Sequence, residues 1–146
     1  MRERLILGAM ILLTGCTDEQ GGGPSDDFDI SAVWSFSGEA ASTGGLAGTC
    51  SFAGTLALTQ TGTTAEGTID GPLTCNISEV AEVDDNLNQE PVEGIQVDGN
   101  NVSWSQDNCE FAGEVQNDDR IEGDLNCTTS SLGVPVDIVG TWQMNR

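Results

Sequence analysis

Apolar and polar residues alternate along several stretches between residues 30 and 144, which is the two-residue period of a β-strand with one buried face. No stretch shows the period of about 3.6 residues that an amphipathic helix requires. The alternation is clearest in the predicted strands 30–38, 92–98, 102–106 and 136–144. The pattern therefore predicts an all-β domain.

A short motif occurs twice in the middle of the chain. The segment Cys50-Ser-Phe-Ala-Gly54 matches Cys109-Glu-Phe-Ala-Gly113. Each copy is followed by a turn and by a returning strand that contains Glu-Gly and ends at a second cysteine. Because an internal repeat signals a repeated structural unit, we predict two β-hairpins of one design.

The turns of these hairpins fix which residues face each other. A two-residue turn at Gly62-Thr63 sets the register of the first hairpin, and a polar turn centred on residue 118 sets that of the second. Both registers bring the two cysteines of the hairpin face to face, on the face that carries the apolar residues. A structural zinc site is the alternative, but no Cys-x-x-Cys is present. We therefore predict the disulfides Cys50–Cys75 and Cys109–Cys127.

The same registers place glycines opposite each other, Gly54 with Gly71 and Gly113 with Gly123. Such pairs suit a sheet that bends sharply or that lets a facing side chain approach closely. About eight short antiparallel strands, with Gly-Thr-Trp at 140–142, resemble the small up-and-down barrels of the lipocalin and avidin class. The resemblance implies that the first strand closes against the last. A disulfide-braced β-sandwich is the alternative.

A barrel of this size has room either for packed side chains or for one small ligand. The first and the last predicted strands, and the strand around residue 104, carry large side chains. We expect these side chains to point into the barrel. These candidate cavity residues are Trp34, Phe36, Trp104, Trp142 and Met144. The alternative is that they fill the core, which is the commoner role of aromatic residues inside a small barrel.

The segment from Glu79 to Glu90 is the longest that we expect outside the strands. Its oxygen-bearing side chains alternate in a way that resembles the start of a calcium-binding loop, at Asp84, Asn86, Asn88 and Glu90. The match fails at Gln89, where the glycine of the sharp turn belongs, and at Ile95, where the bidentate glutamate would fall. We therefore expect a solvated acidic loop and no metal site.

The first 15 residues have the pattern of a secretory signal, in which Arg2 and Arg4 precede an apolar stretch too short to span a bilayer. This stretch ends in Leu13-Thr14-Gly15-Cys16, which resembles the lipobox of bacterial lipoproteins. The resemblance implies cleavage before Cys16 and attachment of diacylglycerol and a further acyl chain such as palmitate. Thr17, where an aspartate would favour the inner membrane, implies an outer-membrane location. An ordinary signal peptide is the alternative.

Residues 17–29 are polar, rich in Gly and Asp, and too poor in apolar side chains to pack. We therefore expect residues 16–29 to be a lipidated cysteine with a flexible tether. Residues 30–146 then form one domain. At least two acyl chains on Cys16 would give stable anchoring without a membrane-binding face on the domain.

The chain is strongly acidic, with 24 Asp and Glu, four Lys and Arg, and a formal net charge of −20. Removal of the first 15 residues takes away Arg2, Glu3 and Arg4, which leaves two basic and 23 acidic residues and a charge of −21. Such a surface repels phosphate backbones and anionic lipid head groups, so we expect no nucleic-acid partner. We favour solubility in a salty exterior as the reason for this charge, and an acidic-partner or cation-binding role is the alternative.

The sequence contains no His, Lys or Tyr, which removes the usual general bases, Schiff-base amines and imidazole ligands. Carboxylate catalysis would need two carboxylates placed in a cleft, and no such pair stands out. We predict a protein that is not an enzyme and has no cofactor. The first hypothesis is a membrane-anchored, surface or periplasmic lipoprotein with a binding or structural β domain. The second is a carrier of a small hydrophobic ligand, which a connected cavity would favour; an enzyme comes third.

Overall fold

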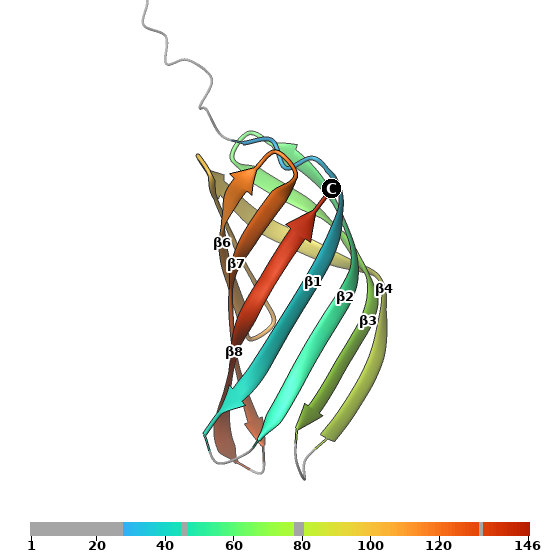
Figure 1. The fold of residues 1–146 in the computed structure, drawn as a ribbon, viewed down its shortest axis with the longest axis vertical. Helices are drawn as coiled ribbons and strands as arrows, with labels where there is room; N and C mark the ends of the chain where they lie inside the picture. Colours follow the sequence, from blue (N-terminus) through green and yellow to red (C-terminus); the bar gives the residue numbers. More distant parts are fainter. Residues whose placement is uncertain (1–27, 45–46, 78–80, 132) are drawn as a thin grey trace, which may run out of the picture.

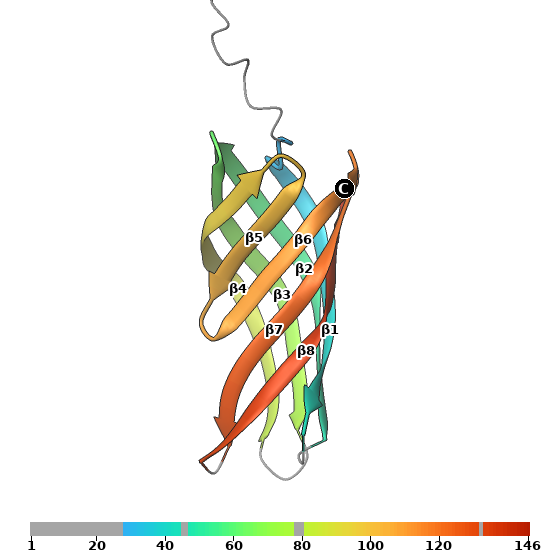
Figure 2. The same ribbon diagram turned by 90° about the vertical axis from the view of Figure 1, so that its left-hand side faces the viewer.

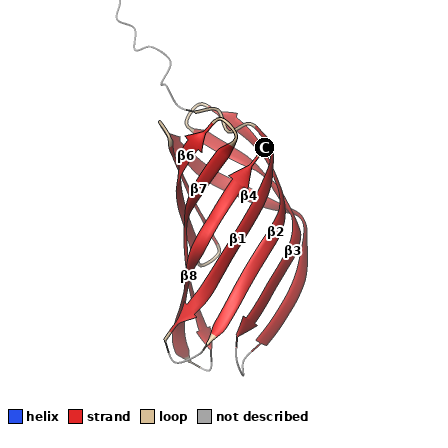
Figure 3. Ribbon diagram, in the orientation of Figure 1, coloured by secondary structure: helices blue, strands red, loops and turns tan. Residues whose placement is uncertain are grey.

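The structure, a computed structural model, describes residues 28–44, 47–77, 81–131 and 133–146. These residues form strands joined by short turns, and the described part contains no helix (Figure 3). The strands are β1 (Ala32–Thr43), β2 (Gly48–Thr61), β3 (Thr64–Ile77), β4 (Ala81–Asp98), β5 (Asn101–Gln106), β6 (Cys109–Asn117), β7 (Arg120–Ser131) and β8 (Val134–Asn145).

Each strand pairs antiparallel with its neighbours in sequence, and β1 pairs with β8 to close the barrel (Figure 1). The β1–β8 ladder runs from Ser35 opposite Asn145 to Thr43 opposite Asp137. Closure removes the two outer edges that an open sheet would expose. The predicted up-and-down barrel is confirmed, and the β-sandwich alternative is excluded.

Both hairpin registers agree with the prediction. In the first hairpin Cys50 faces Cys75 across the turn at Gly62-Thr63, and in the second Cys109 faces Cys127. The two disulfides join cysteines whose Cα atoms are 4.0 Å and 3.9 Å apart. The turn of the second hairpin is Asp118-Asp119 and is not centred on residue 118 as predicted. A register shift between Val115 and Asn117 absorbs the extra residue, so the pairs from Val115–Ile121 to Cys109–Cys127 are still the predicted ones.

The Gly113–Gly123 pair makes room for the indole ring of Trp142. A Cβ atom placed on Gly123 would lie 2.6 Å from Cε2 of Trp142 and 2.6 Å from the Cα of Gly113. The indole Nε1 donates a hydrogen bond to the main-chain oxygen of Asp124, at 2.9 Å. The glycine pair therefore does what the sequence suggested, since a facing side chain packs directly on the backbone.

One half of the barrel is a solid core. This half, called here the closed end, carries the turns at 62–63, 99–100 and 118–119, and both the C-terminus and the start of β1 lie there (Figure 1). Its side chains are fully buried and belong to a single cluster that includes Trp34, Leu56, Val97, Val102, Ile121 and Met144. Buried side chains thus fill the interior of this half.

The segment before β1 covers the closed end. The main-chain nitrogen of Phe28 donates to the oxygen of Gly99, at 3.1 Å, and Trp34 Nε1 donates to the oxygen of Ile30, at 2.9 Å. The guanidinium group of Arg146 lies over the rings of Trp34 and Phe28, 4.4 Å and 5.3 Å from their centroids. Phe28 and Asp29, which the sequence placed in the tether, thus contact the barrel, because Phe28 packs against the core cluster.

The prediction that residues up to 90 form a loop was wrong for the described part of that segment. Strand β4 begins at Ala81, and its residues pair with β3, as Asp84 does with Thr74 and Leu87 with Gly71. The ladder is interrupted by a register shift near Gln89, whose φ of 51° is unusual for a residue other than glycine. The long ladder with β3 outweighs the low strand preference of Asp and Asn.

The strand pairing of the barrel wall is interrupted between β4 and β7, and this interruption is called here the side window. Strand β4 has 18 residues, but only Gln96, Val97 and Asp98 pair with β5. Figure 2 shows the β5–β6 hairpin ending partway along the barrel while β4 and β7 continue beyond it. Beyond Cys127, β7 pairs with β8 alone in the described part. The side window is therefore bounded by β4, by the turn Asp107-Asn108 and by the end of β7.

Candidate functional site

An apolar cavity of about 520 Å³ occupies the half of the barrel away from the closed end. This volume lies in the range of small-molecule sites in proteins, about 300–1,000 Å³. Its wall comes from β1, β2, β3, β4, β6, β7 and β8, together with the turn between β5 and β6. The apolar side chains that line it include Phe52, Leu73, Leu87, Phe111, Leu125 and Ile138.

Three leucines of this half are only partly shielded from water, although other inward-facing residues such as Val136 and Ile138 are buried. Leu73, Leu87 and Leu125 face the barrel interior but are half-buried, in contrast to Leu56 in the closed end, which is 0% exposed. The alternation of β3 and β7 points these leucines inward, yet too few side chains meet at the centre to fill the space. Incomplete filling therefore creates the cavity.

An aromatic cluster forms the inner end of the cavity and separates it from the solid core. Its members are Phe36, Phe52, Trp104, Phe111 and Trp142, with ring centroids 4.3 Å to 6.4 Å apart in the neighbouring pairs. Trp104 stacks on Phe111 with an angle of 5° between their planes. These rings give a rigid, apolar surface against which a ligand body can pack.

Both disulfides belong to the cavity wall. Cys50, Cys75, Cys109 and Cys127 line the cavity, and all four are half-buried. Cys50 and Cys127 also pack against a small buried cluster of Ala40, Val136 and Ile138. Each bridge ties two neighbouring strands, so the bridges and this cluster together hold the wall of the cavity in place.

The cavity mouth is polar, unlike its interior. Gln106, Asp107, Asn108, Thr128, Thr129 and Ser130 line it at the side window. The nitrogen of Thr128 donates to the oxygen of Asn108, at 2.9 Å, which fixes the β5–β6 turn against β7. Across the window the Gln106 Nε2 donates to the oxygen of Pro91, at 3.4 Å. A ligand that enters here would pass from polar groups at the rim to apolar groups inside.

The structure divides the five aromatic and Met residues proposed from the sequence into two groups. Phe36 and Trp142 line the cavity. All five belong to the buried core cluster, but Trp34, Trp104 and Met144 do not line the cavity; Trp104 stacks on Phe111, which does. Leu73, Leu87 and Leu125 also line the cavity and were not predicted to do so. Leu87 lies in the segment that was expected to be a loop, and the alternation around Leu73 and Leu125 does not distinguish a filled half of the barrel from an empty one.

The residues considered for calcium lie along strand β4 and do not form a loop. Asn86, Asn88 and Glu90 are exposed. Among the described residues, no group of three or more His, Cys, Asp or Glu side chains is placed to hold a metal ion. The carboxylate of Asp70, on the neighbouring strand β3, accepts a hydrogen bond from the main-chain nitrogen of Gln89, at 2.8 Å. This carboxylate therefore binds the backbone of β4 beside its irregularity.

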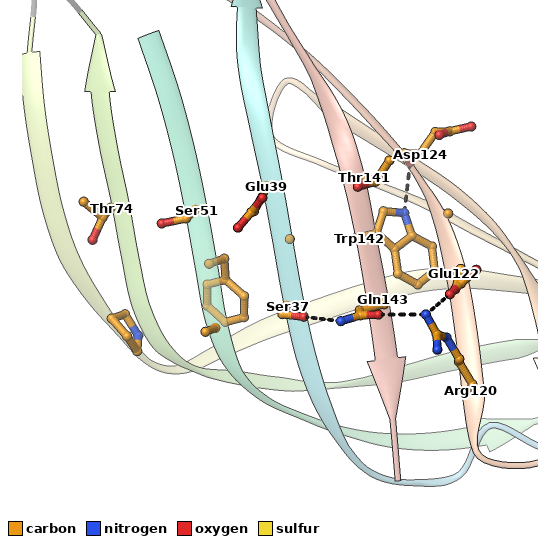
Figure 4. Close-up of a pocket in the computed structure, with 15 residues that line it drawn as sticks. Ser37, Glu39, Ser51, Thr74, Arg120, Glu122, Asp124, Thr141, Trp142 and Gln143 are labelled. Atoms are coloured by element: carbon orange, nitrogen blue, oxygen red, sulfur yellow. Dashed lines mark hydrogen bonds and ion pairs between the residues drawn. The ribbon is translucent and has the colours of Figure 1, made fainter.

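A second depression lies on the outer surface of the barrel and is polar. It has a volume of about 910 Å³ and crosses β3, β2, β1, β8 and β7 (Figure 4). Gln143 Nε2 donates to Ser37 Oγ, at 3.3 Å, and Arg120 donates to Gln143 Oε1, at 3.3 Å. Arg120 also forms an ion pair with Glu122. These four side chains thus bind one another, and most of the polar side chains in the depression are exposed.

Among the residues that the structure describes, one carboxyl group, that of Asp29, has a displaced pKa, and it lines neither the cavity nor the outer depression. Asp29 accepts hydrogen bonds from the side chain and the main chain of Ser31, and these hold its pKa below the ordinary value. Asp29 sits at the closed end, where its main-chain oxygen also accepts from Arg146. This displacement therefore belongs to the structure of the closed end.

Cys16 and the rest of the signal and lipobox lie outside the described residues. Within residues 28–44, 47–77, 81–131 and 133–146, no helix has the length and hydropathy needed to cross a membrane. Comparison of the chain with protein-family models, with curated proteins and with solved structures found no match.

Proposed function

We propose that this protein is a lipid-anchored, outer-membrane lipoprotein whose barrel binds a small apolar ligand in the cavity behind the side window. The observation that carries the proposal is the cavity itself, which is of ligand size, apolar inside and polar at its mouth. Sites for small molecules combine these properties. The cavity favours the carrier hypothesis over a purely structural module.

The composition of the cavity supports binding without catalysis. The titratable side chain in its described lining is Asp107 at the mouth, and its four cysteines are joined in disulfides. A general acid and base, or a nucleophile with an activating base, would need at least two such groups together. The ligand would therefore leave the cavity unchanged.

Filling the cavity tests this function. We expect Leu125→Trp to weaken binding of a neutral probe such as decanol by roughly tenfold or more, because the indole would occupy the ligand's space. The matched control is Val139→Trp on the neighbouring strand, since Val139 is 42% exposed and faces outward. Calorimetric titration measures both. Equal affinity of Leu125→Trp and the parent protein would contradict the proposal.

The lipid anchor is tested separately. We expect Cys16→Ser to abolish incorporation of labelled fatty acid in a bacterial host and to shift the protein from the membrane to the soluble fraction, because the acyl chains supply the anchoring energy. Thr17→Asp, which keeps the cysteine, should retain the label and change only the membrane in which the protein is found. Unchanged membrane retention of Cys16→Ser would refute the anchor.

The outer depression of Figure 4 supports the alternative of a binding module for a polar partner. It is open and larger than the cavity, and it carries Glu39 and Asp124 as well as the Arg120–Glu122 ion pair. This alternative predicts that substitutions there, such as Glu39→Gln with Asp124→Asn, abolish partner binding while decanol binding stays unchanged.

A further inference from the structure

The distribution of charged side chains around the cavity limits the charge that the head group of a ligand can carry. The folded part of the chain has two positively charged side chains, Arg120 and Arg146. Arg146 stacks on Trp34 and Phe28 at the closed end, and Arg120 pairs with Glu122 on the outer surface. Neither residue lines the cavity. No cationic side chain can therefore neutralise an acidic ligand there.

The mouth of the cavity instead carries negative charge. Asp107 lies in its lining, and a polar depression beside it includes Asp107 and Glu110. Asp137 lies close by, where its carboxylate accepts a hydrogen bond from Thr128 Oγ1, at 3.3 Å. A carboxylate is stable near apolar surface only with an opposite charge or several donors aimed at it. At this mouth a ligand carboxylate would face like charge.

Resting on the function proposed above, we propose that the cavity selects amphiphiles with an uncharged or cationic head and rejects those with a carboxylate. The apolar body lies against the aromatic cluster, and the head stays at the side window beside Asp107 and the hydroxyl and amide groups of Thr129 and Asn108. The acidic character of the whole chain acts in the same direction, since it attracts cations and repels anions.

Three probes with one apolar body test the selection: decanol, decylammonium and decanoate. Each is titrated by calorimetry at neutral pH, below its micelle-forming concentration and in about 0.15 M salt, where charges farther than ~8 Å are largely screened. We expect decanol and decylammonium to bind and decanoate to bind roughly tenfold more weakly or not at all. Decanoate binding within about threefold of decanol would overturn the selection. Absence of binding by all three probes would instead refute the proposed function itself.

A single substitution tests whether the charge at the cavity mouth causes the preference against a carboxylate head group. Asp107 has a φ of 53°, a conformation that asparagine tolerates well, so Asp107→Asn should keep the turn intact. We expect this variant to narrow the gap between decanol and decanoate by several-fold and to weaken decylammonium relative to decanol. The control is Asp118→Asn, which removes the same charge in the β6–β7 turn at the closed end. Identical selection in Asp107→Asn and Asp118→Asn would overturn the assignment.

Discussion

Replacement of Gly123 by alanine is expected to destabilise the barrel by about 3 kcal/mol or more, because the added Cβ meets atoms that cannot move aside easily. It would lie 2.6 Å from the Cα of Gly113 and 2.6 Å from the indole of Trp142, and it would also contact the oxygen of Ala112. To relieve the contact with its ring, the indole of Trp142 must move away from the Gly113–Gly123 pair. It then loses its hydrogen bond to the main-chain oxygen of Asp124. Urea unfolding gives the loss of stability, and near-ultraviolet circular dichroism reports the displaced indole.

Gly38→Ala is the control for this experiment. Gly38 lies opposite Trp142 on β1, but its nearest contact to an added Cβ is 3.3 Å, to the oxygen of Thr141. We expect a cost below about 1 kcal/mol, since a shift of a few tenths of an ångström relieves this contact. If Gly123→Ala were as stable as Gly38→Ala, Trp142 would not pack on the glycine pair as described.

Removal of a disulfide is expected to have a comparable effect. Cys50→Ala with Cys75→Ala, or Cys109→Ala with Cys127→Ala, should each lower the free energy of unfolding by about 3 kcal/mol, mainly because the unfolded chain gains freedom. The bridged residues are 25 and 18 positions apart, so the first loss should be only slightly larger. Denaturant unfolding of each double variant measures the change.

Two further measurements check the pairing. Reduced wild-type protein should unfold at the same denaturant concentration as a variant that lacks the four bridged cysteines and keeps Cys16. Peptide mapping without reductant should yield Cys50 linked to Cys75 and Cys109 linked to Cys127. A peptide that joins cysteines of different hairpins would contradict the registers of both, because the pairs face each other across their own turns.

The hairpin registers could be predicted because several local constraints agree on them. In the second hairpin the cysteines, the glycine pair and the apolar face all require the same partners, and a slip of the whole ladder by one residue breaks every one of them. The irregularity next to the turn at 118–119 could not be predicted, because it changes none of these pairs. The closure of β1 on β8 was predicted from an architectural resemblance. It agrees with the alternation of apolar residues in both strands, which points Trp34 and Phe36 of β1 and Trp142 and Met144 of β8 inward. All these features can be recognised in short stretches of sequence.

Strand β4 and the cavity could not be predicted in the same way. The segment from 81 to 90 is rich in Asp, Glu and Asn, which have low strand preference, and it becomes a strand through its partner β3. The side window arises from the different lengths of β4 and β5, a property of three-dimensional pairing. Whether Leu73 and Leu125 meet other side chains or empty space depends on the same geometry.

The free edge of β4 beside the side window also bears on how these molecules behave when crowded. An exposed strand edge is a template on which another chain can add a strand, which leads to aggregation. Pro91 offers its oxygen to Gln106 on this side, and its nitrogen carries no hydrogen to donate there. The irregularity at Gln89 and the φ of 70° at Gly94 break the regular spacing, and Asp85, Glu90 and Glu93 are exposed along the strand. We therefore expect the free edge of β4 to resist pairing with a strand of another molecule, although it borders the side window.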